Sequence, residues 1–229
     1  MDIFNFFFQE APKVTKFLTL STIALSLLSW FEIISPIGLY LNFNLIVKKF
    51  QIWRLFTNFM YFGEFSLSFF FHAIIYFRNS KLLEKNVFKG NVADYIFFLV
   101  FCMMILLFLS YFTGSLFLAQ SLSFAMTYYW GRKSKLTQVE LMGIFNIRAP
   151  YLPMVYLTIS FLLDNNFVTD LLGLIAGHLF FYFRDILPRI KKFGNKSLLK
   201  TPDFIVKICD KLNINNDYLL EGEEGDFLF

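Results

Sequence analysis

Long apolar segments alternate with shorter polar connections along most of the chain. Six of these segments are candidates for membrane-spanning helices, at residues 17–34, 55–77, 95–112, 116–130, 151–163 and 170–185. The first is too long for the core of a cleavable signal peptide and no small-x-small cleavage site follows it, so we expect it to remain as a span. The connection at 39–52 is semi-apolar and amphipathic, which predicts a first loop that lies at the membrane interface.

The composition supports the same class. Of the 229 residues, 57% are hydrophobic and 34 are Phe, which leaves too little polar surface to coat a soluble domain of this size. We therefore predict an all-α membrane protein, with a six-transmembrane-helix bundle at 1–190 and a polar, partly disordered tail at 191–229. Cys102 and Cys209 lie far apart and give neither a disulfide framework nor a metal-binding spacing. No cofactor, metal ion or nucleic-acid partner is predicted.

The positive charges are distributed unequally between the two sides of this topology. Eighteen of the 21 Lys and Arg lie on the side that carries both termini, and the other three are Lys48, Lys49 and Arg54. Because cytosolic loops carry an excess of Lys and Arg, we expect both termini in the cytosol.

Two of the expected spans are short. At 1.5 Å per residue, helices at 116–130 and 151–163 would be about 22 Å and about 20 Å long, against roughly 30 Å for a hydrocarbon core. Either these helices extend into the flanking connections, or the bilayer thins beside them. A thinner bilayer would lower the barrier for a polar segment that crosses it.

The last apolar segment combines small and ionisable residues. Gly173 and Gly177 are four residues apart, so they fall on one helix face and allow another helix to come close. Asp170 and His178 flank this pair, and ionisable groups at membrane depth are costly. The pair is consistent with helix packing that carries no chemistry, whereas its polar neighbours raise the question of a site.

Polar residues also mark the second and fourth segments. Gln120, Ser123 and Thr127 are spaced by three and four, on one helical face. Together with Asn58 they are candidates to line a wet cavity, and ordinary hydrogen bonding between helices is the alternative. Glu64 and His72 are further polar residues of the second segment, which we expect a neighbouring helix to satisfy.

Four motifs carry a family resemblance. They are QIWRLFTNFMYFG at 51–63, YWGR at 129–132, NIRAPYLP at 146–153 and DLLGLIAGH at 170–178. In order and spacing, over about residues 5–205, the chain resembles the Derlin family. The resemblance implies a rhomboid-like fold in the endoplasmic reticulum membrane and a role in returning misfolded proteins to the cytosol.

The resemblance also implies roles for individual residues. Trp53 and Arg54 are similar to the family's first-loop anchor: the indole suits the interface, and the guanidinium can bind loop backbone or lipid phosphate. In the related rhomboid proteases a Ser nucleophile lies in a Gly-x-Ser-Gly setting, but the register against Trp130 places Ala119 at that position. The register of the glycine pair places Asp170 where the catalytic His would lie.

An active rhomboid protease is nevertheless the main alternative. A dyad of Ser121 and His178 would require the two helices to slide relative to the family pattern, so we favour a structural His178 that is hydrogen-bonded to a neighbouring helix. A small-solute transporter is a further alternative, but it would be expected to show an inverted repeat, which the sequence lacks.

Partners follow from the resemblance as well. It implies misfolded proteins as substrates that enter between the second and fifth spans, a membrane ubiquitin ligase complex, a cytosolic AAA ATPase and the lipid bilayer, and it leaves a homo-oligomer open. Several Derlins end in a Phe-x-Gly-x-Gly-type box that binds the ATPase, which Phe193-Gly194 and the stretch 222–225 do not form. The ligase complex is therefore expected to supply the ATPase, and the acidic end is either a docking peptide or a solvated tail.

Overall fold

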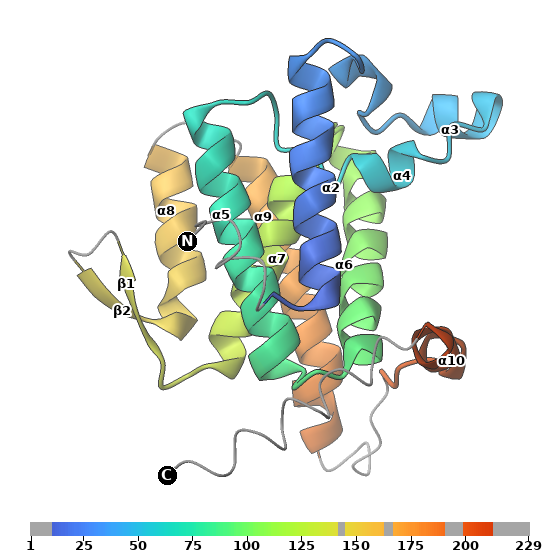
Figure 1. Cartoon of the computed structure of the whole chain (residues 1–229). Helices are drawn as coiled ribbons and strands as arrows, with labels where there is room; N and C mark the ends of the chain where they lie inside the picture. The colour runs from blue at the N-terminus through green and yellow to red at the C-terminus, as the bar shows by residue number, and fades with distance from the viewer. Residues whose placement is uncertain (1–10, 142–144, 163–166, 191–198, 213–229) are drawn as a thin grey trace, which may run out of the picture.

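The computed structural model describes residues 11–141, 145–162, 167–190 and 199–212. Within these residues the main body is a bundle of helices that run alternately up and down (Figure 1). Its helices are α2 (Lys13–Trp30), α5 (Leu67–Leu82), α6 (Val92–Thr113), α7 (Ala119–Lys133), α8 (Leu152–Leu162) and α9 (Phe167–Phe181).

Helix α7 is the centre of this bundle. Every residue from Ser121 to Gly131 is buried, because α5, α6, α8 and α9 all pack around α7 (Figure 1). Its neighbours supply a core rich in aromatic rings, and Tyr129 packs against Phe98 of α6 and Phe180 of α9. The helix with the expected polar face is thus the one that the other helices surround.

Two helices of the described chain are long and apolar enough to cross a membrane. They are Val92–Thr113, with 22 residues and a mean hydropathy of 2.6, and α9 with its continuation, Phe167–Arg189, with 23 residues and a mean hydropathy of 1.3. The other bundle helices are shorter or more polar, so the six-span bundle stays a prediction for them.

The second apolar segment is not one helix, which corrects the expected span at 55–77. The short helix α4 (Arg54–Thr57) is followed by a break, where Gly63 adopts a positive φ of 109°. Helix α5 then begins after Ser66, whose hydroxyl accepts the Phe69 amide hydrogen as an N-cap. It continues through a π-helical stretch, η2 (Leu83–Val87), so much of the expected loop at 78–94 is helical.

The fourth helix is shifted by three residues from the expected 116–130. Gly131, one residue beyond the expected end, lies buried inside α7. A Cβ at Gly131 would lie 2.5 Å from the Ala149 carbonyl oxygen. The glycine therefore serves a close approach of the following connection rather than a helix stop.

That connection contains a β-hairpin, so the expectation of an all-α protein is wrong here. Strands β1 (Gln138–Leu141) and β2 (Phe145–Arg148) pair antiparallel, with Val139 opposite Ile147. Val139 is buried and Ile147 packs on the core, whereas the polar neighbours Gln138, Asn146 and Arg148 are exposed. This alternation with period two is concealed when hydropathy is averaged over a longer window. The 3₁₀ turn η3 (Ala149–Tyr151) then leads into α8.

The remaining short elements lie at the two ends of the bundle. The first loop holds η1 (Pro36–Gly38) and α3 (Phe43–Lys49), which projects sideways from the bundle (Figure 1). At the other end α9 continues into η4 (Tyr182–Ile186) and η5 (Leu187–Arg189). The tail includes an ordered helix, α10 (Asp203–Lys211), whereas the expected acidic end lies outside the described residues.

Candidate functional site

Arg54 and Trp53 hold the first loop together. The buried Arg54 guanidinium donates from Nη1 to the carbonyl oxygens of Ile37 and Tyr40, at 2.9 and 2.8 Å. Its Nε donates to Gln51 Oε1 at 2.7 Å. Of the two expected uses of this group, it therefore serves loop backbone rather than lipid phosphate. The Trp53 indole is half exposed, and its Nε1 donates to the Gly38 carbonyl at 3.4 Å.

Asn58 lies away from the cavity that it was expected to line. It is fully buried after α4, where its Nδ2 donates to the Arg54 carbonyl. Its own carbonyl accepts the Leu118 amide hydrogen at 3.1 Å, just before α7 begins. Because the second apolar segment breaks here instead of continuing as a helix, Asn58 links the first loop to α7.

The paired glycines bring α9 directly onto α7. A Cβ at Gly173 would lie 2.2 Å from the Ser121 carbonyl oxygen, and one at Gly177 would lie 2.8 Å from that of Ala125. Real Cβ atoms are not found this close to a backbone oxygen, so both positions require glycine for the helices to meet as they do.

Ala119 and Asp170, which the sequence register predicts to stand at the nucleophile and base positions of a rhomboid, are both buried. Ala119 is buried at the first turn of α7, and Asp170 is 2% exposed in α9. The Asp170 carboxylate accepts a hydrogen bond from Gln120 Nε2 at 2.8 Å. The Gln120 amide thus satisfies one oxygen of the Asp170 carboxylate.

Ser121 and His178 do not form a dyad. The Ser121 hydroxyl donates to the Thr169 carbonyl at 2.7 Å, while His178 Nδ1 lies 2.6 Å from the Tyr128 hydroxyl. Ser121 and Tyr128 are seven residues apart on α7, which is about 10 Å at the helical rise. His178 is therefore hydrogen-bonded to a neighbouring helix, two turns away from the serine.

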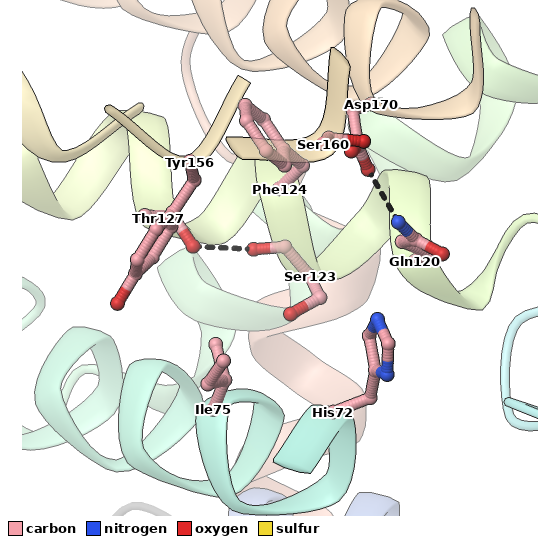
Figure 2. A pocket seen from close by; sticks show the side chains of 9 residues that line it. All are labelled: His72, Ile75, Gln120, Ser123, Phe124, Thr127, Tyr156, Ser160 and Asp170. Carbon is pink, nitrogen blue, oxygen red and sulfur yellow. Dashed lines mark hydrogen bonds between the residues drawn. The ribbon is translucent and has the colours of Figure 1, made fainter. Parts of the chain in front are cut away.

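A cavity of about 140 Å³ lies between α5, α7, α8 and α9 (Figure 2). Three residues of the expected polar face of α7, Gln120, Ser123 and Thr127, line it, and so does Asp170. The other residues around it come from three helices: His72, Ile75, Phe124, Tyr156 and Ser160.

Several of these residues were not expected from the sequence. His72 was expected to hydrogen-bond to a neighbouring helix. Instead, its Nδ1 lies 2.7 Å from the Ser68 carbonyl oxygen of its own helix, and its ring lines the cavity. Tyr156 and Ser160 are four residues apart in α8, so they share one helix face. That spacing was the available signal for a polar stripe on the fifth segment.

A second cavity, of about 170 Å³, lies at the break between α4 and α5. It is lined by Tyr61, Phe62, Gly63, Phe117, Gln120 and Thr169. Gln120 lines both cavities, so its hydrogen bond to Asp170 lies between them. Polar groups thus continue from the loop end of α7 into the middle of the bundle.

Comparison with known proteins identifies the family. A model of the Der1-like family matches residues 11–203, which includes the whole helix bundle. The chain belongs to the Der1-like family, the Derlins. This confirms the resemblance carried by the four sequence motifs.

Individual Derlins match most of the chain. A probable derlin-2 homolog of Dictyostelium discoideum is 37% identical over 214 residues, which cover 90% of this chain and 83% of the relative. Derlin-2.2 of Arabidopsis thaliana is 38% identical, with 86% and 84% covered, and Derlin-1.1 of Zea mays is 30% identical, with 91% and 85% covered. The similarity extends over both the first-loop anchor and the cavity, and it places the chain among membrane proteins.

Proposed function

We propose that this Derlin is a rhomboid-like pseudoprotease of the endoplasmic reticulum membrane that helps to move misfolded proteins back to the cytosol. The observation that carries the proposal is the polar cavity between α5, α7, α8 and α9. Asp170, Gln120, Ser123 and Ser160 offer hydrogen-bonding groups at a depth where lipid offers none. A polypeptide that crosses the membrane needs such groups for its backbone.

The length of α7 supports a locally thinned bilayer. Helix α7 has 15 residues, which correspond to about 22 Å at the helical rise. It is shorter than a hydrocarbon core of roughly 30 Å, so the bilayer beside it is expected to thin. The cavity lies beside this helix, where a crossing segment would meet the least hydrocarbon.

The packing of α5 and α8 supports lateral entry. Helix α5 packs on α2 and α7, α8 packs on α7 and α9, and α5 and α8 have at most weak contact with each other. Residues from both helices line the cavity, including His72 and Tyr156. In this proposal a substrate enters from the bilayer between α5 and α8, the second and fifth spans.

The geometry at Ala119 and Asp170 supports a role without proteolysis. The nucleophile position holds a methyl group, the base position holds a carboxylate that is bonded to Gln120, and Ser121 is bonded to backbone. We therefore assign the protein to the inactive branch of the fold, with both termini in the cytosol as the charge distribution favours. A ubiquitin ligase complex and a cytosolic AAA ATPase complete the proposed pathway. Phe193-Gly194 and residues 222–225 lie outside the described part of the chain.

A site-specific photocrosslinker tests the cavity. Benzoylphenylalanine would replace Ile75, which lines the cavity, or Met104, which is exposed on α6. Both variants would be expressed in cells that lack their own Derlins and that carry a luminal misfolded reporter, with the ATPase blocked. We expect crosslinks to the reporter from position 75 and not from position 104, together with reporter degradation that depends on the protein. Degradation without crosslinks at position 75 would contradict the assigned route.

The same cells separate this proposal from proteolysis. Cleavage of a transmembrane reporter into defined fragments, lost in Ser121→Ala or Ser123→Ala, would identify a protease. We expect no such fragments from the unmodified protein or from either variant.

A further inference from the structure

Helix α10 has one broad apolar face, and the bundle covers only part of it. Ile205 and Cys209 are buried against the core beside α6. Phe204, Ile208 and Leu212 are 63%, 54% and 60% exposed. These three follow one another at intervals of four residues, so they form a continuous stripe, which we call the outer stripe of α10.

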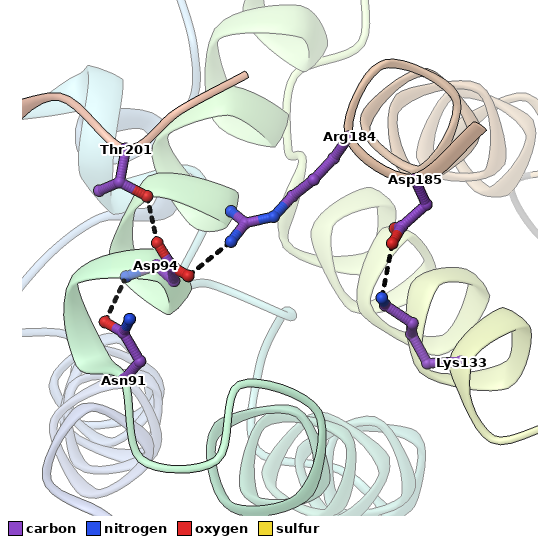
Figure 3. Close-up of polar contacts among 6 residues, drawn as sticks. All are labelled: Asn91, Asp94, Lys133, Arg184, Asp185 and Thr201. Atoms are coloured by element: carbon purple, nitrogen blue, oxygen red, sulfur yellow. Dashed lines mark hydrogen bonds and ion pairs between the residues drawn. The ribbon is translucent and has the colours of Figure 1, made fainter. Parts of the chain in front are cut away.

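The position of α10 is fixed at the beginning of α6. The Asp94 carboxylate, in the first turn of α6, accepts a hydrogen bond from the Thr201 hydroxyl just before α10 (Figure 3). It also pairs with Arg184 Nη2 at 2.5 Å, and the Arg184 guanidinium lies over the rings of Phe88 and Phe180. Thr201 and Arg184 therefore converge on one carboxylate, so α10 is held at this end of the bundle.

The direction of α10 suits a membrane surface. Figure 1 looks nearly along the axis of α10, whereas α6 runs upright in the same view. Helix α6 has 22 residues and is about 33 Å long, enough to span a hydrocarbon core of roughly 30 Å. A helix that lies across the first turns of such a span is at the depth of the lipid headgroups, parallel to the surface.

The charges of α10 are sorted around the outer stripe. At 100° per residue, Lys207 and Lys211 lie about 100° and about 60° from Ile208, on one side of the stripe. Asp203 and Asp210 lie about 140° and about 160° from Ile208, toward Val206. The cations thus border one edge of the exposed apolar stripe, and the carboxylates lie further around the helix. This is the arrangement of an interfacial helix whose lysines reach up to lipid phosphates.

We propose that α10 is a membrane-surface helix, which inserts Phe204, Ile208 and Leu212 into the leaflet at which α6 begins and binds anionic lipid headgroups through Lys207 and Lys211. The stripe would enter the boundary between headgroups and acyl chains by about 5–10 Å. Together with α6, α10 would fix the depth of the bundle at this leaflet. The inference requires only that α6 spans a bilayer, and it is independent of the proposed route for misfolded proteins.

The test places an environment-sensitive fluorophore on either side of α10 in the full-length protein. Cys102 and Cys209 would be replaced by Ala, and one new cysteine would be introduced by Ile208→Cys or Asp210→Cys and labelled with an NBD maleimide. Each protein would be placed in nanodiscs of phosphatidylcholine, with or without phosphatidylserine. An unchanged midpoint of thermal unfolding would show that each variant is folded.

Lipid contact gives a distinct pattern of emission and quenching. We expect a blue-shifted emission at position 208 and quenching by lipids that carry a nitroxide near the headgroup end of the acyl chain, and neither effect at position 210. Water-like emission at both positions would overturn the proposal. So would a blue shift at position 208 that no nitroxide lipid quenches, since a second copy or another protein would then cover the stripe.

Charge variants test whether Lys207 and Lys211 bind anionic lipid headgroups. In discs with phosphatidylserine, Lys207→Gln with Lys211→Gln should reduce lipid quenching at position 208. The matched pair Lys48→Gln with Lys49→Gln removes the same charge from exposed positions in the first loop, at the other end of the bundle, and should leave the quenching unchanged. Equal effects of the two pairs would overturn the assignment of anionic lipid to these lysines.

Discussion

The Glu84 carboxylate accepts both the backbone amide hydrogen and the hydroxyl hydrogen of Thr15, at 2.9 and 2.7 Å, across 69 residues of sequence. The Val14 amide hydrogen points to the same carboxylate at 3.2 Å. These residues form the first turn of α2, where amide hydrogens have no partner inside the helix and the helix dipole favours negative charge. A fully buried glutamate of η2 thus caps the first helix of the bundle.

Substitution of this cap should destabilise the bundle. Glu84→Gln keeps the shape but turns an acceptor oxygen into a donor that faces buried amide hydrogens. We expect a loss of about 1–3 kcal/mol, the cost of an unsatisfied buried group. It would be read from the midpoint of thermal unfolding in detergent. Glu64→Gln changes an exposed carboxylate of the same type and is the control. Equal midpoints for the two variants would contradict the capping role.

The glycine pair allows a graded prediction. A Cβ at Gly173 would come closer to α7 backbone than one at Gly177, at 2.2 against 2.8 Å. Gly173→Ala should therefore be the more destabilising of the two, and overpacking of this kind costs about 1–3 kcal/mol. Gly38→Ala is the control, because a Cβ there would meet nothing closer than 4.0 Å. Thermal unfolding of the three variants checks the order, and a larger effect at Gly177 would contradict the described packing.

The first-loop anchor should require arginine rather than any cation. Arg54 Nη1 reaches two carbonyl oxygens while Nε reaches Gln51, a fork that the single ammonium of lysine cannot reproduce. Arg54→Lys should therefore loosen residues 36–52, seen as faster hydrogen exchange of the first loop, and should slow degradation of a luminal misfolded reporter. Lys48→Arg lies in the same loop and is exposed, so it should change neither measurement. Unchanged exchange in Arg54→Lys would contradict the anchor.

The sequence predicted those parts of the structure that depend on spacing along a single helix. Gly173 with Gly177, and Gln120 with Ser123 and Thr127, repeat at three or four residues, so the shared face follows from helical geometry alone. The sequence did not predict the break at Gly63 or the hairpin around Val139. Gly63 lies in a stretch apolar enough for a span, and Val139 lies in a connection between two expected spans. Both features depend on the local backbone conformation, which hydropathy does not predict.

The cavity shows the same limit. Its α7 residues could be named because they share a face, but Asn58 was misplaced because its segment breaks before α5 begins. His72 was missed as a lining residue because its ring nitrogen is satisfied within its own helix, and no pattern along the chain reveals which wall a satisfied histidine faces. Contacts between helices decide which side chains line the cavity, and those contacts depend on how the whole bundle packs.

The docking of α10 can be followed through a native thiol. Cys209 is buried between α10 and the bundle, and burial, with a smaller effect of Asp210, raises the pKa of its thiol. Because the thiolate is the reactive form, a raised pKa and poor access both slow alkylation at neutral pH. In the intact protein Cys209 should therefore react slowly with a maleimide, and Cys102, which is fully buried in α6, should react more slowly still.

Thr201→Val removes the hydroxyl that bonds to Asp94 without changing the shape of the side chain, so α10 should detach more often and Cys209 should become accessible. A hydrogen bond to a charged group contributes about 1.5–3 kcal/mol when it is shielded, and less here because Asp94 is partly exposed. We therefore expect Cys209 labelling to rise by about threefold to tenfold, measured by mass spectrometry of the labelled protein. Thr158→Val removes an exposed hydroxyl of α8 and should leave the rate unchanged. An unchanged rate in Thr201→Val would mean that Ile205 and Cys209 hold α10 on the bundle without help from Asp94.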